Sequence, residues 1–408
     1  MVHFNILLTF PVVRDFDYFY QNLCTMVSKA WLSGLFEAEY GSSPLVFQSP
    51  GRINLIGEHT DYNGGWVMPA GIDKACSLAI LPQKEGPTTI WAFDLQDKIS
   101  VDTFPSAATD SHWSNYVFGV CLAFSRRGVK LPHFQAIVSS DIPVGAGLSS
   151  SAALESVFAF AFNEISGAGF DSMELTRIAR EAENEFVGLQ CGIMDMFASI
   201  HARQDHAIRL DCQSLAYEYV PLAMGGNKIL LFDTCLKHDL ASSEYNLRRQ
   251  ECEQVVHHFQ SLGIEAQTLR DITMPQLMGA APDLDPVSFN RARFVLEENE
   301  RVELFAEAMQ TGNWALAGEQ LYASHAGLKN DYAVSCKELD FLVDAVSGQQ
   351  GVWGGRMMGG GFGGCTINIV AASAVDDLVQ KVASAYLNVF GVEPKHYIAS
   401  TGDGACKL

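Results

Sequence analysis

The sequence is poor in positive charge. It has 27 Lys and Arg residues against 47 Asp and Glu, which gives a formal net charge of -20 at pH 7. Nucleic acids and anionic membrane surfaces bind proteins through a basic face, so this balance argues against both as main partners. Small molecules remain the expected partners. A polyanionic ligand would have to be held by backbone dipoles, a metal ion and a few placed cations.

Closely spaced cysteines and long apolar runs are also missing. The ten cysteines are scattered without a C-x-x-C pair, which excludes the common zinc and redox motifs and favours a reducing compartment. No apolar run approaches the length of a membrane span. The opening MVHFNILLTFPVVRDFDYFY has no basic stretch before its short apolar run, so we expect mature protein and not a signal peptide. These absences lead us to expect a cytoplasmic protein.

The length and the residue pattern predict two lobes of an α+β protein. At 408 residues the chain exceeds one small core, and we expect lobes at 1–224 and 225–408. Alternating apolar residues predict strands in 46–104 and 134–141. Apolar residues spaced three and four apart predict two helices after residue 141 and further helices across most of 242–345. A further strand is expected in CTINIVAA.

The first two of those helices have clear ends. One is expected over 150–165 and stops at Gly167, and the other starts at Asp171 and stops at Gly188. Asp171 and Glu174 are spaced as a capping box. Within the later helical region, 263–286 has a looser pattern, and we expect a connection there.

Residues 143–156, PVGAGLSSSAALES, form a Gly/Ser turn between a strand and a helix. A P-loop would carry a lysine in G-x-x-x-x-G-K-[ST], and here the lysine is absent. The helix start leaves backbone N–H groups unpaired, the glycines allow close approach, and serine hydroxyls can donate or ligate a metal. The turn therefore fits a phosphate site without a lysine, while an ordinary serine-capped helix remains the alternative.

The segment GRINLIGEHTDYNGG at 51–65 places four ionisable side chains beside an apolar strand. Arg52, Glu58, His59 and Asp61 would be unfavourable to bury without partners, so they should pair with each other or with a ligand. Neighbouring hydroxyls of a sugar would suit these carboxylates. A solvated hairpin loop with a surface ion pair is the competing interpretation.

Three other features are ambiguous by themselves. The glycine-dense GGRMMGGGFGGC at 354–365 allows close packing against backbone or ligand, or is only a tight turn. Asp195, among apolar residues in QCGIMDMFAS, is a helix cap, a core ion pair or a catalytic group. Glu183 in EAENEFVG is equally ambiguous, and an exposed helix face is its commonest explanation.

Together these segments resemble the galactokinases, within the superfamily of small-molecule kinases that includes homoserine and mevalonate kinases. The resemblance extends in family order over residues 50–365. Five segments carry it: GRINLIGEHTDYNGG, PVGAGLSSSAALE, AENEFVGLQCGIMD, KHDLASSEYNLRR and GGRMMGGGFGGC. It implies a ribosomal-protein-S5-domain-2-like N-terminal lobe, a ferredoxin-like C-terminal lobe and an active site in the cleft between them.

The activity implied is ATP-dependent phosphorylation of the anomeric C1 hydroxyl of α-D-galactose to galactose 1-phosphate, a step of galactose catabolism by the Leloir pathway. ATP and Mg²⁺ would be needed, and we expect a monomer without nucleic acid or membrane partners. The family roles carried over make Asp195 the catalytic base and Arg52 the stabiliser of developing charge. The sugar-binding positions are Glu58, His59, Thr60, Asp61, Gly192 and Tyr245. The ATP-binding positions are Gly145, Ala146, Gly147, Leu148, Ser149, Ser150 and Ser151. Ser151 and Glu183 match the magnesium ligands.

Four positions depart from the family pattern, and two other activities stay open. Met196 stands where Gln is common, Gly355 and Met358 alter GARMTGGG, and Asp239 replaces Ser or Glu. An N-acetylgalactosamine kinase would share every motif, and galactose sensors bind the same ligands without turnover. Family sensors lose residues in the serine run, which is intact here, so the enzyme is favoured.

Overall fold

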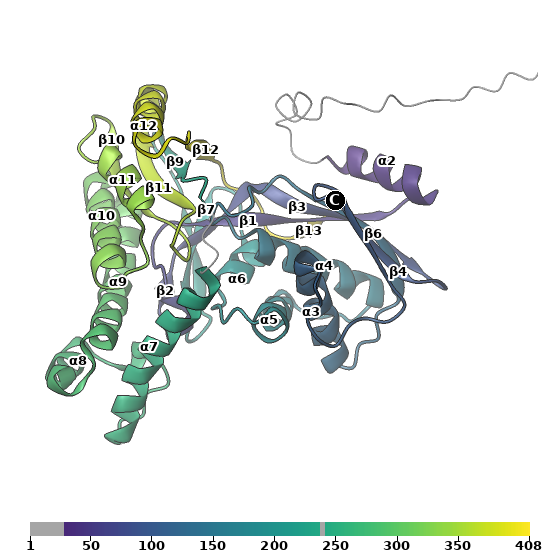
Figure 1. Ribbon diagram of the computed structural model, residues 1–408, viewed down its shortest axis with the longest axis horizontal. Coiled ribbons are helices and arrows are strands. Elements are labelled where there is room, and N and C mark those ends of the chain that lie inside the picture. The colour runs from purple at the N-terminus through teal and green to yellow at the C-terminus, as the bar shows by residue number, and fades with distance from the viewer. Residues whose placement is uncertain (1–27, 237–240) are drawn as a thin grey trace, which may run out of the picture.

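The computed structural model describes residues 28–236 and 241–408, which form two lobes (Figure 1). The opening stretch of the sequence and Asp239 lie outside these residues. A six-stranded sheet in the order β13-β1-β3-β6-β4-β5 forms the centre of the first lobe. All its neighbours are antiparallel except β4 and β6, which are parallel. Its strands are β1 (Leu45–Asn54), β3 (Pro69–Gln83), β4 (Thr88–Ala92), β5 (Asp97–Val101), β6 (His133–Ser140) and β13 (Cys406–Lys407).

Helices cover both faces of this sheet, with α2 on one side and α3, α4 and α5 on the other (Figure 1). Successive strand residues point to opposite faces, so Val46 packs with Phe36 of α2 while Phe47 joins the core that contains Phe158 of α4. The helices are α2 (Lys29–Tyr40), α3 (His112–Arg126), α4 (Ser150–Ser166) and α5 (Ser172–Glu181). The predicted strands of this lobe are confirmed.

The two predicted helix ends are found where glycine permits a left-handed backbone. Helix α4 ends at Gly167 with φ 67°. After α5 the backbone widens into the π-helix η2 (Ala182–Val187), which ends at Gly188. The predicted capping box forms only by half. Asp171 accepts from the Glu174 N–H, but the Glu174 carboxylate binds Arg127 instead of the cap.

A small sheet in the order β2-β7-β8 lies between the main sheet and the second lobe. Its strands are β2 (Trp66–Val67), β7 (His206–Asp211) and β8 (Tyr217–Pro221). The short 3-10 helix η1 (Asp61–Asn63) precedes β2, and α6 (Met194–His201) precedes β7. This region therefore brings the 57–65 loop close to the start of α6.

The second lobe contains an antiparallel sheet in the order β10-β11-β9-β12. Leu230 and Phe232 of β9 pack against α11 and α12 on one face, and Ile229 and Leu231 join the main core on the other. The strands are β9 (Asn227–Asp233), β10 (Val352–Met357), β11 (Cys365–Ala371) and β12 (Lys395–Ala399).

The region 242–345 is mostly helical, as predicted. The segment 263–286 is more ordered than expected, because it contains η3 (Leu269–Asp271), α8 (Met274–Ala280) and η4 (Ala281–Asp283). The short helix η5 (Ala372–Ala374) leads into α12. The longer helices of this lobe are α7 (Ala241–Ser261), α9 (Pro286–Thr311), α10 (Trp314–Asn330), α11 (Lys337–Val346) and α12 (Val375–Phe390).

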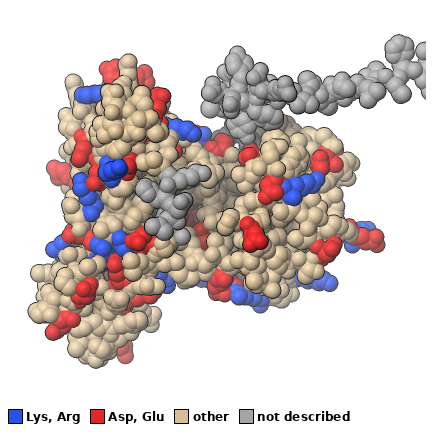
Figure 2. Space-filling model, viewed as in Figure 1, with Lys and Arg blue, Asp and Glu red and all other residues tan. Residues whose placement is uncertain are grey.

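Strand β13 follows the second lobe in sequence but pairs with β1 of the first, through Phe47 with Lys407 and Gln48 with Cys406. Acidic and basic side chains are interspersed over the face shown in Figure 2, and this face has no continuous basic patch. No helix in the described part of the chain combines the length and apolarity that crossing a membrane requires.

Candidate active site

Arg52 and Asp195 form a two-point ion pair between β1 and α6. The Arg52 Nε donates to Asp195 Oδ1 at 2.9 Å and Nη2 donates to Oδ2 at 3.0 Å. The pairing register of β1 with β3 shifts between Pro50 and Arg52, an irregularity of the kind that often lies beside active sites. Arg52 is 4% exposed and Asp195 is 28% exposed, so the carboxylate remains reachable from solvent.

The same arginine reaches the turn before α4. Its Nη1 donates to the Gly147 carbonyl, and its backbone N–H donates to the Leu148 carbonyl at 3.0 Å. The Ser149 hydroxyl donates to Asp195 Oδ2 at 2.5 Å. Arg52 and Ser149 thus fix the position of the Asp195 carboxylate relative to the turn.

The predicted phosphate turn, residues 145–151, has the backbone of a ligand cradle. Gly145 and Gly147 have φ of 81° and 73°, and Ser149 is left-handed at 58°. A Cβ at Gly145 would meet no atom within 4 Å, so open space lies there. Ala146 and Leu148 are buried in the core, so only their backbone groups remain for a ligand. The serine at 149 does not cap α4, which leaves the first N–H groups of that helix free of a side-chain cap.

The glycine loop, residues 359–364, packs backbone to backbone against this turn. A Cβ on Gly359 would lie 3.5 Å from Gly147 Cα, and one on Gly364 would lie 3.5 Å from the Ala146 carbonyl carbon. Gly361 has even less room, since its Cβ would stand 2.2 Å from the Val334 carbonyl oxygen. Close packing against another backbone, one of the possibilities that the sequence left open, is therefore present.

Asp61 and Gly192 are nearly in contact. A Cβ added at Gly192 would lie 1.9 Å from Asp61 Oδ2, so any side chain there would displace the carboxylate. Burial, and then the charge of Asp195, raises the pKa of Asp61 to about 6. The two carboxylates therefore face a common region, and glycine is what allows Asp61 to reach it.

Glu58 binds the second lobe. Its Oε1 accepts from Nη1 and Nη2 of Arg356, both at 3.2 Å, and from the Gly359 N–H at 2.7 Å. Arg356 is fully buried and also donates to the carbonyls of Asn54 and Leu55. This contact ties the glycine loop to the 57–65 loop. Sequence reasoning selected Glu58 but missed Arg356, although it lies within the quoted GGRMMGGG.

Thr60 and His59 have different surroundings. The Thr60 hydroxyl lies 2.9 Å from the Gly57 carbonyl and 2.7 Å from that of Trp66, so it closes the loop on itself. His59 adopts a left-handed backbone with φ 62° and is buried. Its ring lies 5.3 Å from that of Tyr245, which α7 delivers from the second lobe. The structure thus joins His59 and Tyr245 as neighbours.

Glu183 lies on the π-helix, where its carboxylate meets α4. Its Oε1 accepts from the Ser151 hydroxyl at 3.2 Å, and its Oε2 from the Cys191 thiol at 3.4 Å. Burial, and then the nearby Asp195 carboxylate, raises the pKa of Glu183 to about 7. The surface interpretation of Glu183 is wrong, because the side chain is 3% exposed.

The donor set at this point fits magnesium. Mg²⁺ binds through one or two carboxylates together with substrate phosphates and water, and rarely through a complete protein cage. Ser151 and Glu183 supply two oxygens at the start of α4, and among the described residues no group of three His, Cys, Asp or Glu side chains is arranged for a metal. The nine cysteines in 28–236 and 241–408 are all free thiols.

Several residues near the site carried no warning in the sequence. Glu155, one turn after Ser151, is completely buried, and neither of its oxygens has a partner in the described structure. Burial, and then the neighbouring Glu183 carboxylate, raises the pKa of Glu155 well above its ordinary value. Cys191, Tyr62 and Tyr332 also contact predicted site residues. Tyr62 and Cys191 lie within the quoted motifs but were not selected, and Tyr332 follows α10 outside every motif.

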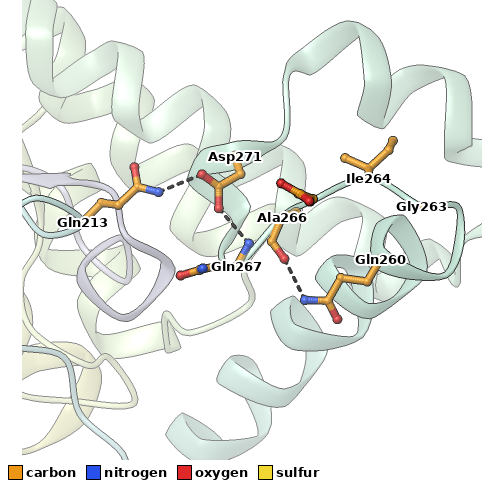
Figure 3. Close-up of a pocket in the computed structure, with 8 residues that line it drawn as sticks. Gln213, Gln260, Gly263, Ile264, Ala266, Gln267 and Asp271 are labelled. Carbon is orange, nitrogen blue, oxygen red and sulfur yellow. Dashed lines mark hydrogen bonds between the residues drawn. The ribbon is translucent and has the colours of Figure 1, made fainter.

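A cavity of about 770 Å³ opens elsewhere, and none of the predicted site residues lines it (Figure 3). Asp271, its best-placed carboxylate, is already occupied: it accepts from Gln213 Nε2 at 2.7 Å and from the Gln267 N–H at 2.8 Å. Gln260 Nε2 likewise donates to the Ala266 carbonyl at 2.7 Å. The residues that the sequence selected gather around Asp195 instead, so we place the functional site there. Its lining residues are Gln213, Gln260, Gly263, Ile264, Glu265, Ala266, Gln267 and Asp271.

Comparison with known proteins identifies the family. Residues 34–82 match the galactokinase galactose-binding signature, 115–203 match the GHMP kinases N terminal domain and 305–388 match the GHMP kinases C terminal domain. The chain is 42% identical to a galactokinase of Thermotoga neapolitana over 88% of its length and 99% of the relative's. The chain belongs to the galactokinases.

Two further matches agree with this assignment. A galactokinase of Bacillus subtilis is 38% identical over 92% of this chain and 98% of its own. The crystal structure of Lactococcus lactis galactokinase complexed with galactose superposes with a TM-score of 0.88 at 33% identity, covering 93% of this chain and 99% of that one. The two-lobed α+β galactokinase fold predicted from the sequence is confirmed.

Proposed function

We propose that this galactokinase transfers the γ-phosphoryl group of ATP to the C1 hydroxyl of α-D-galactose. The observation that carries the proposal is the Arg52–Asp195 pair, which a serine and a carbonyl of the phosphate turn hold at a fixed position. A carboxylate so placed can address an acceptor hydroxyl directly beside a bound triphosphate. The match to a galactokinase complexed with galactose supports galactose as the acceptor.

In this proposal Asp195 orients the C1 hydroxyl and accepts its proton as the oxygen bonds to the γ-phosphorus and the bond to ADP breaks. Phosphoryl transfer of this kind depends mainly on positioning and charge stabilisation, because its transition state is loose. Arg52 is buried and permanently charged, so it keeps Asp195 in one orientation and stabilises charge on the transferring group. Asp195 Oδ1 takes one of the Arg52 bonds and has lone-pair capacity left for the sugar.

For the sugar we propose Asp61, His59 and Tyr245 as contacts and Gly192 as the residue that opens space for Asp61. Glu58 and Thr60 also belong to this set. Glu58 has one oxygen committed to Arg356 and Gly359, so only its other oxygen would serve the sugar. Thr60 contributes through the shape of the loop, since its hydroxyl is directed to backbone carbonyls.

For ATP we propose the backbone N–H groups and hydroxyls of residues 145–151. The open space at Gly145 and the uncapped start of α4 support this. Ser151 and Glu183 would hold Mg²⁺, which when bound offsets the negative charge of the phosphates. Glu183 must be ionised for that role, and its raised pKa makes its ionisation sensitive to pH near neutrality.

We also propose a division at 1–224 and 225–408, a monomer, and a cytoplasmic location. The separate sheets of the two lobes support the division, apart from β13. The remaining rivals are an N-acetylgalactosamine kinase and a non-catalytic galactose sensor. The intact Ser149–Ser151 run disfavours the sensor.

A sugar panel with ATP and magnesium, following ADP release, tests the proposal. The kcat/KM for galactose should exceed that for glucose by up to about 10⁴-fold. The O4 of glucose is displaced relative to that of galactose, so the polar groups of the site that bind O4 would be left unpaired. Equal values would contradict the galactose assignment. A preference for N-acetylgalactosamine would select that kinase, and galactose binding without ADP release would select the sensor.

A further inference from the structure

A buried chain of hydrogen bonds runs from the second lobe to His59. Tyr332 OH lies 3.3 Å from Cys252 Sγ on α7 and 2.8 Å from Tyr62 OH. Tyr62 OH in turn lies 2.8 Å from His59 Nδ1. The chain thus links α7 and the segment after α10 to the 57–65 loop through one thiol and two hydroxyl groups.

Tyr332 is the most firmly held member of this chain. Its side chain is completely buried, and the centre of its ring lies 4.8 Å from that of His59 and 4.9 Å from that of Phe294. Arg248 donates from Nε to the Tyr332 carbonyl at 2.9 Å. Burial raises the pKa of Tyr332 well above its usual value, so the hydroxyl keeps its proton. Arg248 and Phe294, which lie outside the proposed sugar contacts, therefore help to fix its position beside His59.

His59 is neutral in this setting. Burial lowers its pKa to about 3, although the Gly360 carbonyl acts in the opposite direction. A neutral imidazole has one N–H, and the bond made by one nitrogen determines which nitrogen carries it. His59 Nε2 is buried and has no hydrogen-bond partner in the described structure. The bond at Nδ1 and the nearby Gly360 carbonyl together decide what Nε2 offers to a ligand.

The chemistry of the chain favours one direction. A phenol is a better donor than a neutral imidazole N–H, and an imidazole nitrogen is a better acceptor than a phenol oxygen. Tyr62 therefore donates to His59 Nδ1, which leaves the Tyr62 oxygen to accept from Tyr332. The Tyr332 oxygen then accepts from the Cys252 thiol. In this arrangement the protons of Cys252, Tyr332 and Tyr62 each have an acceptor. The single N–H of the neutral His59 ring is then on Nε2.

We propose that Tyr332 is a positioning residue for sugar binding: acting through Tyr62, its hydroxyl keeps His59 in the Nε2–H tautomer. His59 is then a fixed hydrogen-bond donor to a sugar oxygen. This inference rests on the proposed role of His59 as a sugar contact. It adds a residue from the second lobe, far from the 57–65 loop in sequence, to the determinants of galactose affinity.

The first test uses the unmodified protein. Histidine-selective ¹⁵N labelling with long-range ¹H–¹⁵N NMR reports the tautomer, and a His59→Gln spectrum identifies the resonance. Wild-type protein should show the Nε2–H form of His59. An Nδ1–H form would overturn the proposal without reference to any activity.

The second test compares Tyr332→Phe with Tyr386→Phe. Tyr386 is an equally buried tyrosine whose hydroxyl donates to the Thr234 carbonyl at 3.0 Å, away from His59. Tyr386→Phe therefore also removes one buried hydrogen bond and serves as the matched control. Tyr332→Phe should raise the galactose KM by about 3- to 10-fold, the equivalent of one hydrogen bond, with kcat and the ATP KM little changed. It should also mix the two tautomers of His59.

The outcomes separate the two proposals. Equal galactose KM values for the two variants, with His59 unchanged, would reject the positioning role while wild-type activity on galactose still stands. Absence of galactose phosphorylation by the wild type would reject the proposed function, whereas the tautomer would still be measured. If Tyr332→Phe does not fold, an Nδ1–H form of His59 in the wild type would still overturn the proposal.

Discussion

Arg356 and Glu58 form a completely buried ion pair that joins the two lobes. The arginine comes from β10 and the glutamate from the loop that follows β1, and the glutamate also accepts the Gly359 N–H. Glu58 is 2% exposed, so neither charge can be relieved by water if its partner is removed. The pair therefore sets the distance between the glycine loop and the proposed sugar loop.

Arg356→Met should destabilise the protein by about 3 to 5 kcal/mol, because it leaves the Glu58 charge buried and unpaired. Urea unfolding measures this as a change in the free energy of unfolding. Adding Glu58→Gln should restore part of the loss, since the buried charge is then gone. Arg126→Met is the matched control: Arg126 is 46% exposed, and removing its ion pairs should change stability by less than about 1 kcal/mol. A double variant no more stable than Arg356→Met would contradict the buried-charge explanation.

Gly192→Ala should weaken galactose binding. The new Cβ would stand 1.9 Å from Asp61 Oδ2, so the carboxylate must move from its position. We expect the galactose KM to rise about 10-fold or more, the loss of at least one charged hydrogen bond, with the ATP KM little changed. Steady-state kinetics at saturating ATP measure this. Gly279→Ala is the control, because a Cβ there meets nothing within 4 Å. An unaltered galactose KM would remove Asp61 from the sugar site.

Asp195→Asn should lower kcat by about 10²- to 10⁴-fold, the usual effect of losing a positioned general base. Galactose and ATP should still bind, which calorimetry can measure. Loss of the charge also leaves Arg52 unpaired, so the melting temperature must be followed in the same protein. Ser149→Ala is a useful comparison, because it removes one hydrogen bond to Asp195 but keeps its charge. Near-normal turnover by Asp195→Asn would exclude Asp195 as the base.

Stability should fall as pH rises from about 4.5 to 7. The pKa of Glu183 is raised from 4.5 to about 7 in the folded protein, and that of Asp61 from 3.8 to about 6. The unfolded chain releases both protons at lower pH than the folded chain. It therefore binds fewer protons across this interval, which makes the free energy of unfolding decrease as pH increases.

Glu183→Gln should flatten this slope and raise the melting temperature at pH 8, while it raises the magnesium concentration needed for activity. Melting curves at pH 5 and pH 8 without ligands, and magnesium titrations of activity, provide the measurements. Glu319→Gln, at an exposed position, should alter neither. A steeper pH slope in Glu183→Gln would show that burial of Glu183 has been misjudged.

Local sequence predicted what depends on periodicity and on short motifs. The strand at 134–141, helix α4 and its end at Gly167 follow from apolar spacing and from a glycine that tolerates positive φ. The family resemblance then named Asp195, Arg52, Glu183 and Ser151, and the structure places them together. Their chemical roles stay predictions.

The sequence could not predict contacts between segments that lie far apart along the chain. Arg356 is an unremarkable basic residue in a glycine-rich stretch until β10 places it against Glu58. Tyr332 reads as a core aromatic at the end of a helix, and only the packing of the two lobes brings it to Tyr62. The sequence pattern predicted an ordinary α-helix through the π-helix η2. Over only six residues the apolar spacing of a π-helix hardly differs from that of an α-helix.

The pairing of β13 with β1 constrains how this protein is made. Residues 400–405 run along the first lobe, with Gly402 donating to the Gly71 carbonyl and Ala405 to the Ser199 carbonyl, before β13 joins the sheet edge. During translation this segment leaves the ribosome only after all of β9 to β12. The edge of β1 that β13 covers must therefore stay unpaired while the second lobe is synthesised. Such an open edge is a site where nascent chains can associate, so chaperone capture is expected at this stage.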